Sequence, residues 1–328
     1  MKQTLVGILL LTAMPVAAQS GLQKLKTRID SMLNIRYLTV KYDTAYIGRP
    51  KERLTLKLRS NISGSDFNVK HHIDGNDGHY RLSTDHKATV SVGASYMGIS
   101  AGLALNPASL KGKSKDYELN INAYSNRYGI DFIYQESQTL SGSITFNGVN
   151  SYLEKGMADM RVIILDGYYA FNGHRFSYPA AFTQSYIQKR SAGSLLLGFS
   201  YMGCRIKTTD EIPAEDDDQI IRVGHFGIGG GYGYNLVAWR RLLLHLSVLP
   251  TLVVINYNNV EIDGNRRDMD TQFPDFIFTE RASIVYQFNS RCFAGATFVL
   301  SNSLIDASNR MEISYSKWRL RAFVGVRF

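Results

Sequence analysis

The chain has 328 residues, of which 45% are hydrophobic and 12% aromatic, and 37 Lys and Arg against 28 Asp and Glu give a formal charge of +9. This length suits one large domain. A basic balance is compatible with nucleic acid, anionic lipid or an anion-attracting channel, but no nucleic-acid partner is expected because the cations are spread singly and the amino terminus predicts export.

The first residues have the pattern of a secretory signal peptide. Lys2 precedes a short apolar run over residues 5–14, and Val16, Ala17 and Ala18 supply the small residues that a signal peptidase reads. The run is too short for an uncleaved membrane anchor, since spanning takes roughly 20 apolar residues. We therefore expect residues 1–18 to be removed, which leaves 36 basic against 28 acidic residues, because 37 − 1 = 36.

Residues 19–52 are predicted to be a periplasmic lead. Apolar residues recur there at helical spacing between charged ones, which predicts a short amphipathic helix: Leu22, Leu25, Ile29 and Leu33. The mature chain begins at Gln19 and not at Cys, so a lipoprotein anchor is not expected.

From residue 53 to residue 328 the chain repeatedly alternates apolar and polar residues, as strands with two different faces do. The last segment, residues 317–328, has an uncharged face and a face with four cations: Lys317, Arg319, Arg321 and Arg327. In a soluble sandwich the charged face would meet water, whereas in an outer-membrane barrel it would line a wet lumen. The terminal Phe328 resembles the terminal signal of bacterial outer-membrane barrels and favours the barrel.

The sequence therefore predicts an all-β fold, a closed antiparallel transmembrane β-barrel of about 12 strands (10–14) over residues 53–328. The longest apolar run, residues 242–255, has the length of a strand and includes His245, Ser247 and Pro250. Long polar loops are expected at residues 62–85, 106–115, 137–158, 208–219, 257–275 and 303–316. Short turns separate them, and the expected sorting of short and long connections to opposite sides is typical of barrels.

Residues 172–192 break this sorting, because a periplasmic turn is expected where about 20 residues stand. A missed hairpin and a segment folded into the lumen both remain open. We hypothesise a partial plug formed by Phe176, Tyr178, Pro179, Phe182, Gln184, Gln188 and Arg190. It would pack on a lumen wall with little side-chain bulk, made of His225, Gly227, Gly229, Gly231 and Gly233. The alternative is that these glycines relieve barrel curvature.

The inward positions carry more cations than carboxylates. The predicted basic lumen contains Arg53, Lys57, Arg59, Arg281, Arg291, Arg319, Arg321 and Arg327. The predicted function is a pore or transport-related barrel with a basic, partly plugged lumen that prefers anions. A structural or surface-interaction protein of the envelope and a lipid-modifying enzyme are the alternatives. No catalytic residue, metal site or cofactor is predicted, although His225 and His245 are the histidines on strands.

Three segments together resemble an uncharacterised bacterial family: residues 166–172, 176–182 and 188–194, with residues 42–47 similar as well. That family, the domain of unknown function 4421, is found in Bacteroides-type Gram-negative bacteria and taken to consist of outer-membrane barrels. The resemblance implies a porin-like location in the outer membrane and brings no established activity. The expected partners are outer-membrane lipid, lipopolysaccharide and the barrel-assembly machinery, which would recognise the strand ending at Phe328.

Overall fold

A computed structural model describes residues 41–52, 54–73, 76–96, 99–105, 116–208, 219–262, 264–268, 274–306 and 311–328. The chain divides into two compact units, Met1–Lys41 and Tyr42–Phe328, and the second contains the strands and the helix given below. The expected signal peptide, the amphipathic helix over residues 22–33 and Arg53 lie outside the described residues.

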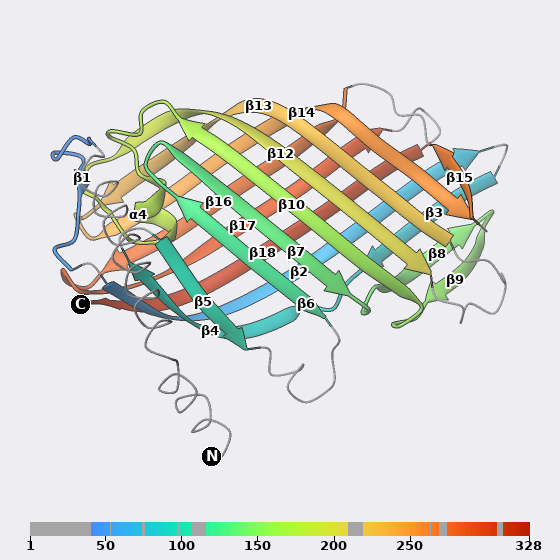
Figure 1. Ribbon diagram of the computed structural model, residues 1–328, viewed down its shortest axis with the longest axis horizontal. Coiled ribbons are helices and arrows are strands. Elements are labelled where there is room, and N and C mark those ends of the chain that lie inside the picture. The colour runs from blue at the N-terminus through green and yellow to red at the C-terminus, as the bar shows by residue number, and fades with distance from the viewer. Residues whose placement is uncertain are drawn as a thin grey trace, which may run out of the picture. The chain divides into compact units, whose positions relative to one another are not determined.

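In its described residues, the unit Tyr42–Phe328 is all-β apart from one short helix (Figure 1). Its elements are β1 (Ile47–Gly48), β2 (Leu54–Ile73), β3 (Asn76–Ser83), β4 (Lys87–Tyr96), β5 (Ile99–Leu105), β6 (Tyr117–Tyr124), β7 (Tyr128–Ser137), β8 (Ser141–Phe146), β9 (Val149–Leu153), β10 (Ala158–Ala170), α4 (Tyr178–Phe182), β11 (Ile187–Gln188), β12 (Ala192–Thr208), β13 (Gln219–Ala238), β14 (Leu242–Ile262), β15 (Asn265–Asp268), β16 (Phe276–Gln287), β17 (Cys292–Asp306) and β18 (Met311–Arg327).

The long strands form one curled antiparallel sheet. Its order is β18-β17-β16-β14-β13-β12-β10-β7-β6-β5-β4-β2-β3-β8-β9, and β15 pairs with β14. The last strand, β18, also pairs with β2, from Met311 with His71 to Arg327 with Thr55. By contrast, β5 and β6 are joined at a single residue pair, Ile99 with Ala123.

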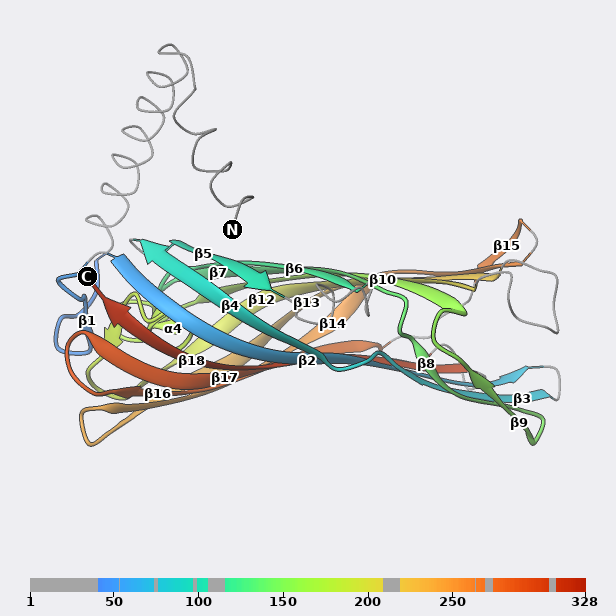
Figure 2. The same ribbon diagram turned by 90° about the horizontal axis from the view of Figure 1, so that it is seen from below.

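The curled sheet has two ends, which we call the near end and the far end. The near end is the one where β2 starts at Leu54 and the chain finishes at Phe328, and α4 also lies there (Figure 1). The far end is the one where β3, β8 and β9 lie, and towards it the two sides of the curled sheet draw together (Figure 2). At the near end, β13 and β14 are joined by residues 239–241, where Trp239 and Arg240 have φ values of 48° and 59° and the Arg241 N–H donates to the Ala238 carbonyl (3.2 Å).

The structure differs from the expected loops at residues 62–85 and 137–158. Strand β2 continues to Ile73 and is followed by β3, while β8 and β9 form a hairpin that extends the sheet from β3. Phe67 and Leu82 on these strands are buried in an apolar cluster at the far end. Burial of such side chains stabilises strands whose His-, Gly- and Asp-rich sequence predicts a solvated loop.

None of the described helices has the length and hydropathy needed to cross a membrane. Residues 172–192 contain α4, and they reach β11, which pairs with β1. These residues therefore form a compact segment tied to the start of the described unit, in place of a short turn. We call residues 172–192 the inner segment.

Candidate functional site

The two faces of the sheet have opposite chemistry, and the charged face is the buried one. On β18, Lys317, Arg319 and Arg327 are 3%, 8% and 0% exposed, whereas Val324 and Phe328 on the other face are 54% and 62% exposed. Other strands repeat the pattern, with exposed Val92, Leu195, Leu246 and Ile255. The interior of the curled sheet is therefore polar at many positions, and its outside is largely apolar.

The local sequence of the inner segment favours a short helix and a turn over a continuous strand. Ser177 caps α4 by accepting a hydrogen bond from the backbone N–H of Ala180 (3.3 Å), and Pro179 lies in the first turn, where a missing N–H costs nothing. The helix ends at Thr183, and Gln184 takes a positive φ of 55°. Phe176, Tyr178, Pro179, Gln184 and Gln188 of the predicted plug are buried, Phe182 is half-buried and Arg190 is exposed.

One side of the inner segment bonds to cations and a hydroxyl on three strands. Lys57 of β2 donates from Nζ to the Thr183 carbonyl and to Gln184 Oε1, the second at 2.5 Å. Arg327 of β18 donates to the Gln184 carbonyl (3.3 Å), and Ser283 of β16 donates to the Ala181 carbonyl (2.8 Å). The acceptors of these bonds on the inner segment are therefore main-chain carbonyls and one side-chain amide oxygen, and none is a carboxylate.

The other side of the inner segment bonds to a different part of the sheet. The Ser177 hydroxyl donates to Asn126 Oδ1 (2.7 Å) in the turn between β6 and β7, and Asn235 Nδ2 of β13 donates to the Ser177 carbonyl (3.0 Å). In the sheet order, other strands stand between β2 and β6 and between β2 and β13. The inner segment therefore spans the interior at the near end instead of lying along one wall.

Residues that precede β2 in the chain also form hydrogen bonds to the inner segment. Besides the pairing of β1 with β11, the Tyr46 carbonyl accepts from the backbone N–H of Lys189 (2.7 Å) and from Gln188 Nε2 (3.3 Å). The Arg190 guanidinium lies 5.9 Å from the centre of the Tyr46 ring.

Farther along the interior, a buried ion cluster joins walls that are not neighbours. Arg281 of β16 donates to Asp131 of β7 (2.9 Å) and lies 3.7 Å from Asp166 of β10. The Tyr124 hydroxyl donates to Asp131, and its ring stacks on Tyr178 of α4 with centroids 6.5 Å apart. The cluster thus connects the inner segment to both sides of the sheet.

A second cross-interior contact lies nearer the far end. Lys317 of β18 pairs with Glu118 of β6 (2.9 Å) and donates to Gln135 of β7 (2.6 Å), which also accepts from Ser65 of β2 (3.2 Å). Beyond it comes the apolar cluster of the far end. Side chains from opposite walls therefore meet at several levels.

A chain of three uncharged polar residues lies under the inner segment. His245 Nδ1 is 2.7 Å from Asn235 Oδ1, and His245 Nε2 is 3.0 Å from the Ser247 hydroxyl. All three residues are at most 4% exposed, and the rings of Phe176, Phe182 and Tyr178 pack on the imidazole.

The hydrogen bonds decide the proton positions in this chain. Asn235 Nδ2 donates to Ser177 and to Gln188 Oε1 (2.9 Å), so Oδ1 must accept from His245 Nδ1–H. The Nε2 lone pair then accepts the Ser247 proton. The three side chains are thus ordered as nucleophile, base and orienting residue, with an amide at the place where serine hydrolases have a carboxylate.

The residues of the predicted basic lumen differ from one another in burial. Lys57, Arg281, Arg319 and Arg327 are buried in the interior, and Arg59 and Arg321 are partly buried there. Arg291 is exposed beside the turn before β17 and lies 3.5 Å from Glu52, so it is not grouped with them.

The glycine-rich wall touches the inner segment at one end. A Cβ on Gly233 would lie 3.0 Å from Phe176, but a Cβ on Gly229 or Gly231 would lie 2.0 Å from backbone oxygens of β14, and Gly227 is also close to that strand. His225 is buried on the same face. These glycines therefore allow close approach of β14 more than of the inner segment.

Sequence reasoning missed Ser247 and Asn235. Ser247 stands two residues after His245, and this shared parity was visible in the sequence. Asn235 comes from the neighbouring strand, where its register opposite His245 is set by the tight turn at Trp239.

Comparisons with known proteins were made over the whole chain. Residues 41–328 match the family described as Domain of unknown function (DUF4421), and no curated protein matches the chain. Three solved structures are similar to it: the translocator domain of autotransporter NalP from Neisseria meningitidis (11% identity, TM-score 0.31, covering 95% of this chain and 98% of that one), the outer membrane protein OprG from Pseudomonas aeruginosa (11%, 0.28, 86% and 98%), and outer-membrane expressed OmpT of Vibrio cholerae (10%, 0.31, 83% and 98%). Because the family match spans most of the sequence, the protein belongs to the DUF4421 family.

Proposed function

We propose that the protein is an integral outer-membrane β-barrel with a closed, basic interior that opens for transport. The observation that supports insertion into the membrane is the burial of the two sheet faces. Ionic side chains such as Arg281 are buried inside, and apolar side chains such as Val324 are exposed outside. In water such an apolar exterior would be costly, and in lipid it is the preferred surface.

The aromatic residues support a membrane band of the right height. On β18, Trp318 and Phe328 both face outward and are ten residues apart, with uncharged outward residues between them. On β16, Phe276 and Tyr286 have the same spacing, with Glu280 as one charged outward residue between them. Ten residues span about 33 Å along a strand, which is about 25 Å along the membrane normal at a tilt of roughly 40°. That matches the apolar band of outer-membrane barrels.

The pairing of β18 with β2 supports a closed ring, because unpaired edges are not tolerated in lipid. The twelve strands of the ring would be β2, β4, β5, β6, β7, β10, β12, β13, β14, β16, β17 and β18. The near end would face the periplasm, and the barrel-assembly machinery would engage the strand ending at Phe328.

The interior contacts support a barrel that is shut at rest. The inner segment bonds to walls on opposite sides at the near end, and Arg281 and Lys317 bond across the interior above it. A constitutively open channel needs a continuous wet path, so conduction requires displacement of the inner segment and separation of these cross-links.

Three arginines would give the opened lumen its preference for anions. Arg59, Arg319 and Arg321 lie close enough to repel one another, and within the described ranges they have no ion pair. Arg321 donates from Nε to Asn61 (2.6 Å), and Arg319 donates to Asn120. Uncompensated cations in a narrow channel concentrate anions.

Planar-bilayer recording of the refolded protein tests this function. We expect no steady current from the wild type, and anion-selective openings when Lys57→Met and Ser283→Ala together remove bonds to the inner segment. Arg241→Gln, in an exposed turn, is the control. A large steady wild-type current would refute the closed interior, cation selectivity would refute the basic lumen, and silence in every variant would refute transport in favour of a structural role.

A second candidate function is hydrolysis, and the observation that favours it is the chain Ser247–His245–Asn235. Its residues are buried, so a substrate could reach Ser247 only after the inner segment moves. A fluorophosphonate probe should then label Ser247 in the Lys57→Met, Ser283→Ala variant and not after His245→Gln. No labelling of either protein would leave the three residues as a structural hydrogen-bond chain.

A further inference from the structure

On four neighbouring strands, the first charged residue of the outward face, counted from the near end, lies at the same level of the sheet. Counting from the near end, outward positions on β7, β10, β12 and β13 carry no charge until Glu136, Arg161, Arg205 and Arg222. The ladder pairs Glu136 with Arg161, Arg161 with Arg205, and Arg205 with Arg222. Three arginines thus stand side by side at the edge of the apolar exterior, and we call them the arginine row.

The arginine row is short of counter-ions at its centre. Arg161 pairs with Glu136 (3.1 Å) on one side, and Arg222 pairs with Glu261 (2.6 Å) on the other. In the part of the chain that the structure describes, Arg205 has no ion pair or hydrogen bond, and its Nε is buried without an acceptor. Like charges directly opposite one another destabilise a sheet, so an anion at this position would relieve the repulsion.

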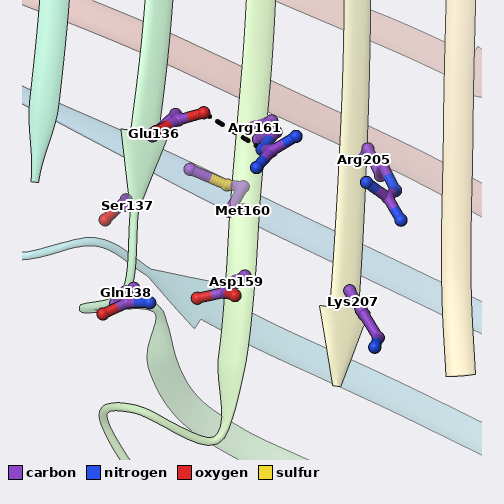
Figure 3. Close-up of a pocket in the computed structure, with 8 residues that line it drawn as sticks. All are labelled: Glu136, Ser137, Gln138, Asp159, Met160, Arg161, Arg205 and Lys207. Atoms are coloured by element: carbon purple, nitrogen blue, oxygen red, sulfur yellow. Dashed lines mark ion pairs between the residues drawn. The ribbon is translucent and has the colours of Figure 1, made fainter. Parts of the chain in front are cut away.

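Two residues of the row, Arg161 and Arg205, line a pocket that would admit such an anion. The pocket has a volume of about 190 Å³, and the other residues that border it are Glu136, Ser137, Gln138, Asp159, Met160 and Lys207. Figure 3 shows Arg161 and Arg205 on adjacent strands, with Lys207 beyond them towards the end of β12. Guanidinium groups present paired N–H donors that match the geometry of phosphate oxygens.

The level of the row fits a lipid headgroup. On β12, the outward residues between Leu195 and Arg205 are uncharged, and the two are ten residues apart. This separation is about 33 Å along the strand and about 25 Å along the membrane normal, which is the height of the apolar band. Arg205 therefore lies where hydrocarbon gives way to headgroups, on the side away from the near end.

We infer that the arginine row binds a phosphate group of the outer-leaflet glycolipid, lipopolysaccharide. The inference rests on the proposed membrane insertion with the near end in the periplasm, because only that orientation puts Arg205 beside outer-leaflet headgroups. Arg205 would hold the phosphate, Arg161 and Arg222 would flank it, and the apolar side chains below the row would contact the acyl chains.

Titration of the refolded protein in detergent with purified lipopolysaccharide tests the inference, with bound lipid measured after size-exclusion chromatography. The test variant is Arg161→Gln, Arg205→Gln, Arg222→Gln. The control, Arg127→Gln, Arg240→Gln, Arg241→Gln, removes the same charge from exposed positions at the near end. We expect the test variant to bind at least about tenfold more weakly, as loss of charge-assisted hydrogen bonds implies, and the control to bind as the wild type does.

Enzymatically dephosphorylated lipopolysaccharide identifies the group that is bound. It should bind wild type and test variant equally weakly, and added salt should weaken only the binding of the phosphorylated form to the wild type. Equal binding of both lipids, an unaffected test variant, or an equal loss in the control would each overturn the inference. Insertion of all three proteins into vesicles is checked separately by heat-modifiable electrophoretic mobility, and failure of the wild type there would refute the membrane barrel itself.

Discussion

Replacing Arg281 with methionine should destabilise the protein severely. The guanidinium is 1% exposed and lies 2.9 Å from Asp131 and 3.7 Å from Asp166, which are 6% and 2% exposed. At an effective dielectric constant of about 20, these separations correspond to attractions of about 6 and 4 kcal/mol. Desolvation offsets much of this, and removing one partner of a buried ion pair typically costs about 3–5 kcal/mol because the remaining charge is uncompensated. We expect a loss of that size.

The assay is reversible unfolding by guanidinium chloride in lipid vesicles, followed by the fluorescence of Trp239 and Trp318. A triple variant that also carries Asp131→Asn and Asp166→Asn should recover at least half of the loss, because it leaves no unpaired carboxylate. Arg241→Met, in an exposed turn, should change stability little. A loss below about 1 kcal/mol for Arg281→Met would show that water reaches the cluster, and the closed interior would be refuted.

Three further outcomes are expected. Ser283→Ala should cost about 1 kcal/mol in the same unfolding assay, because the Ala181 carbonyl loses one of its two donors and keeps only Gln184 Nε2; no change would mean that water replaces the hydroxyl. Gly233→Leu should displace the inner segment, since its Cβ would meet Phe176 at 3.0 Å, and should speed trypsin cleavage of the main chain after Arg190 more than the outward-facing Gly230→Leu does; equal cleavage would contradict the packing. Val324→Arg, near the middle of the apolar band, should cost about 2–4 kcal/mol in vesicles, and a neutral effect would place that face in water.

The orientation of each strand's side chains was readable from the sequence. Because side chains alternate, one apolar residue such as Val324 determines the face of Lys317 and Arg327 on the same strand. The sequence alone could not decide whether the charged face meets water or a lumen. The structure adds that the charged face is the buried one, since Lys317 is 3% exposed.

Which interior residues meet was not readable. Arg281 and Asp131 are 150 residues apart, and Lys317 and Glu118 are 199 apart. Their meeting depends on strand number, tilt and register together, and an error of one strand in the count would change the partners. The far-end hairpin of β8 and β9 was missed for a related reason, because its strands are stabilised by tertiary burial of Leu153 and not by a strong local pattern.

In the proposed channel, closure of the near end and the basic lumen are linked by the groups that hold the inner segment. Lys57 donates there to the Thr183 carbonyl and Arg327 to the Gln184 carbonyl, and neither acceptor carries a net charge. When the segment leaves, both cations become open to the lumen beside Arg59, Arg319 and Arg321, and no carboxylate comes with them. Opening would thus increase the positive potential around these five side chains, and an anion that enters would stabilise the open state because it binds that state more tightly than the closed one. Anions should consequently raise the open probability of the Lys57-retaining Ser283→Ala variant in bilayers, and an equal effect of large cations would contradict this coupling.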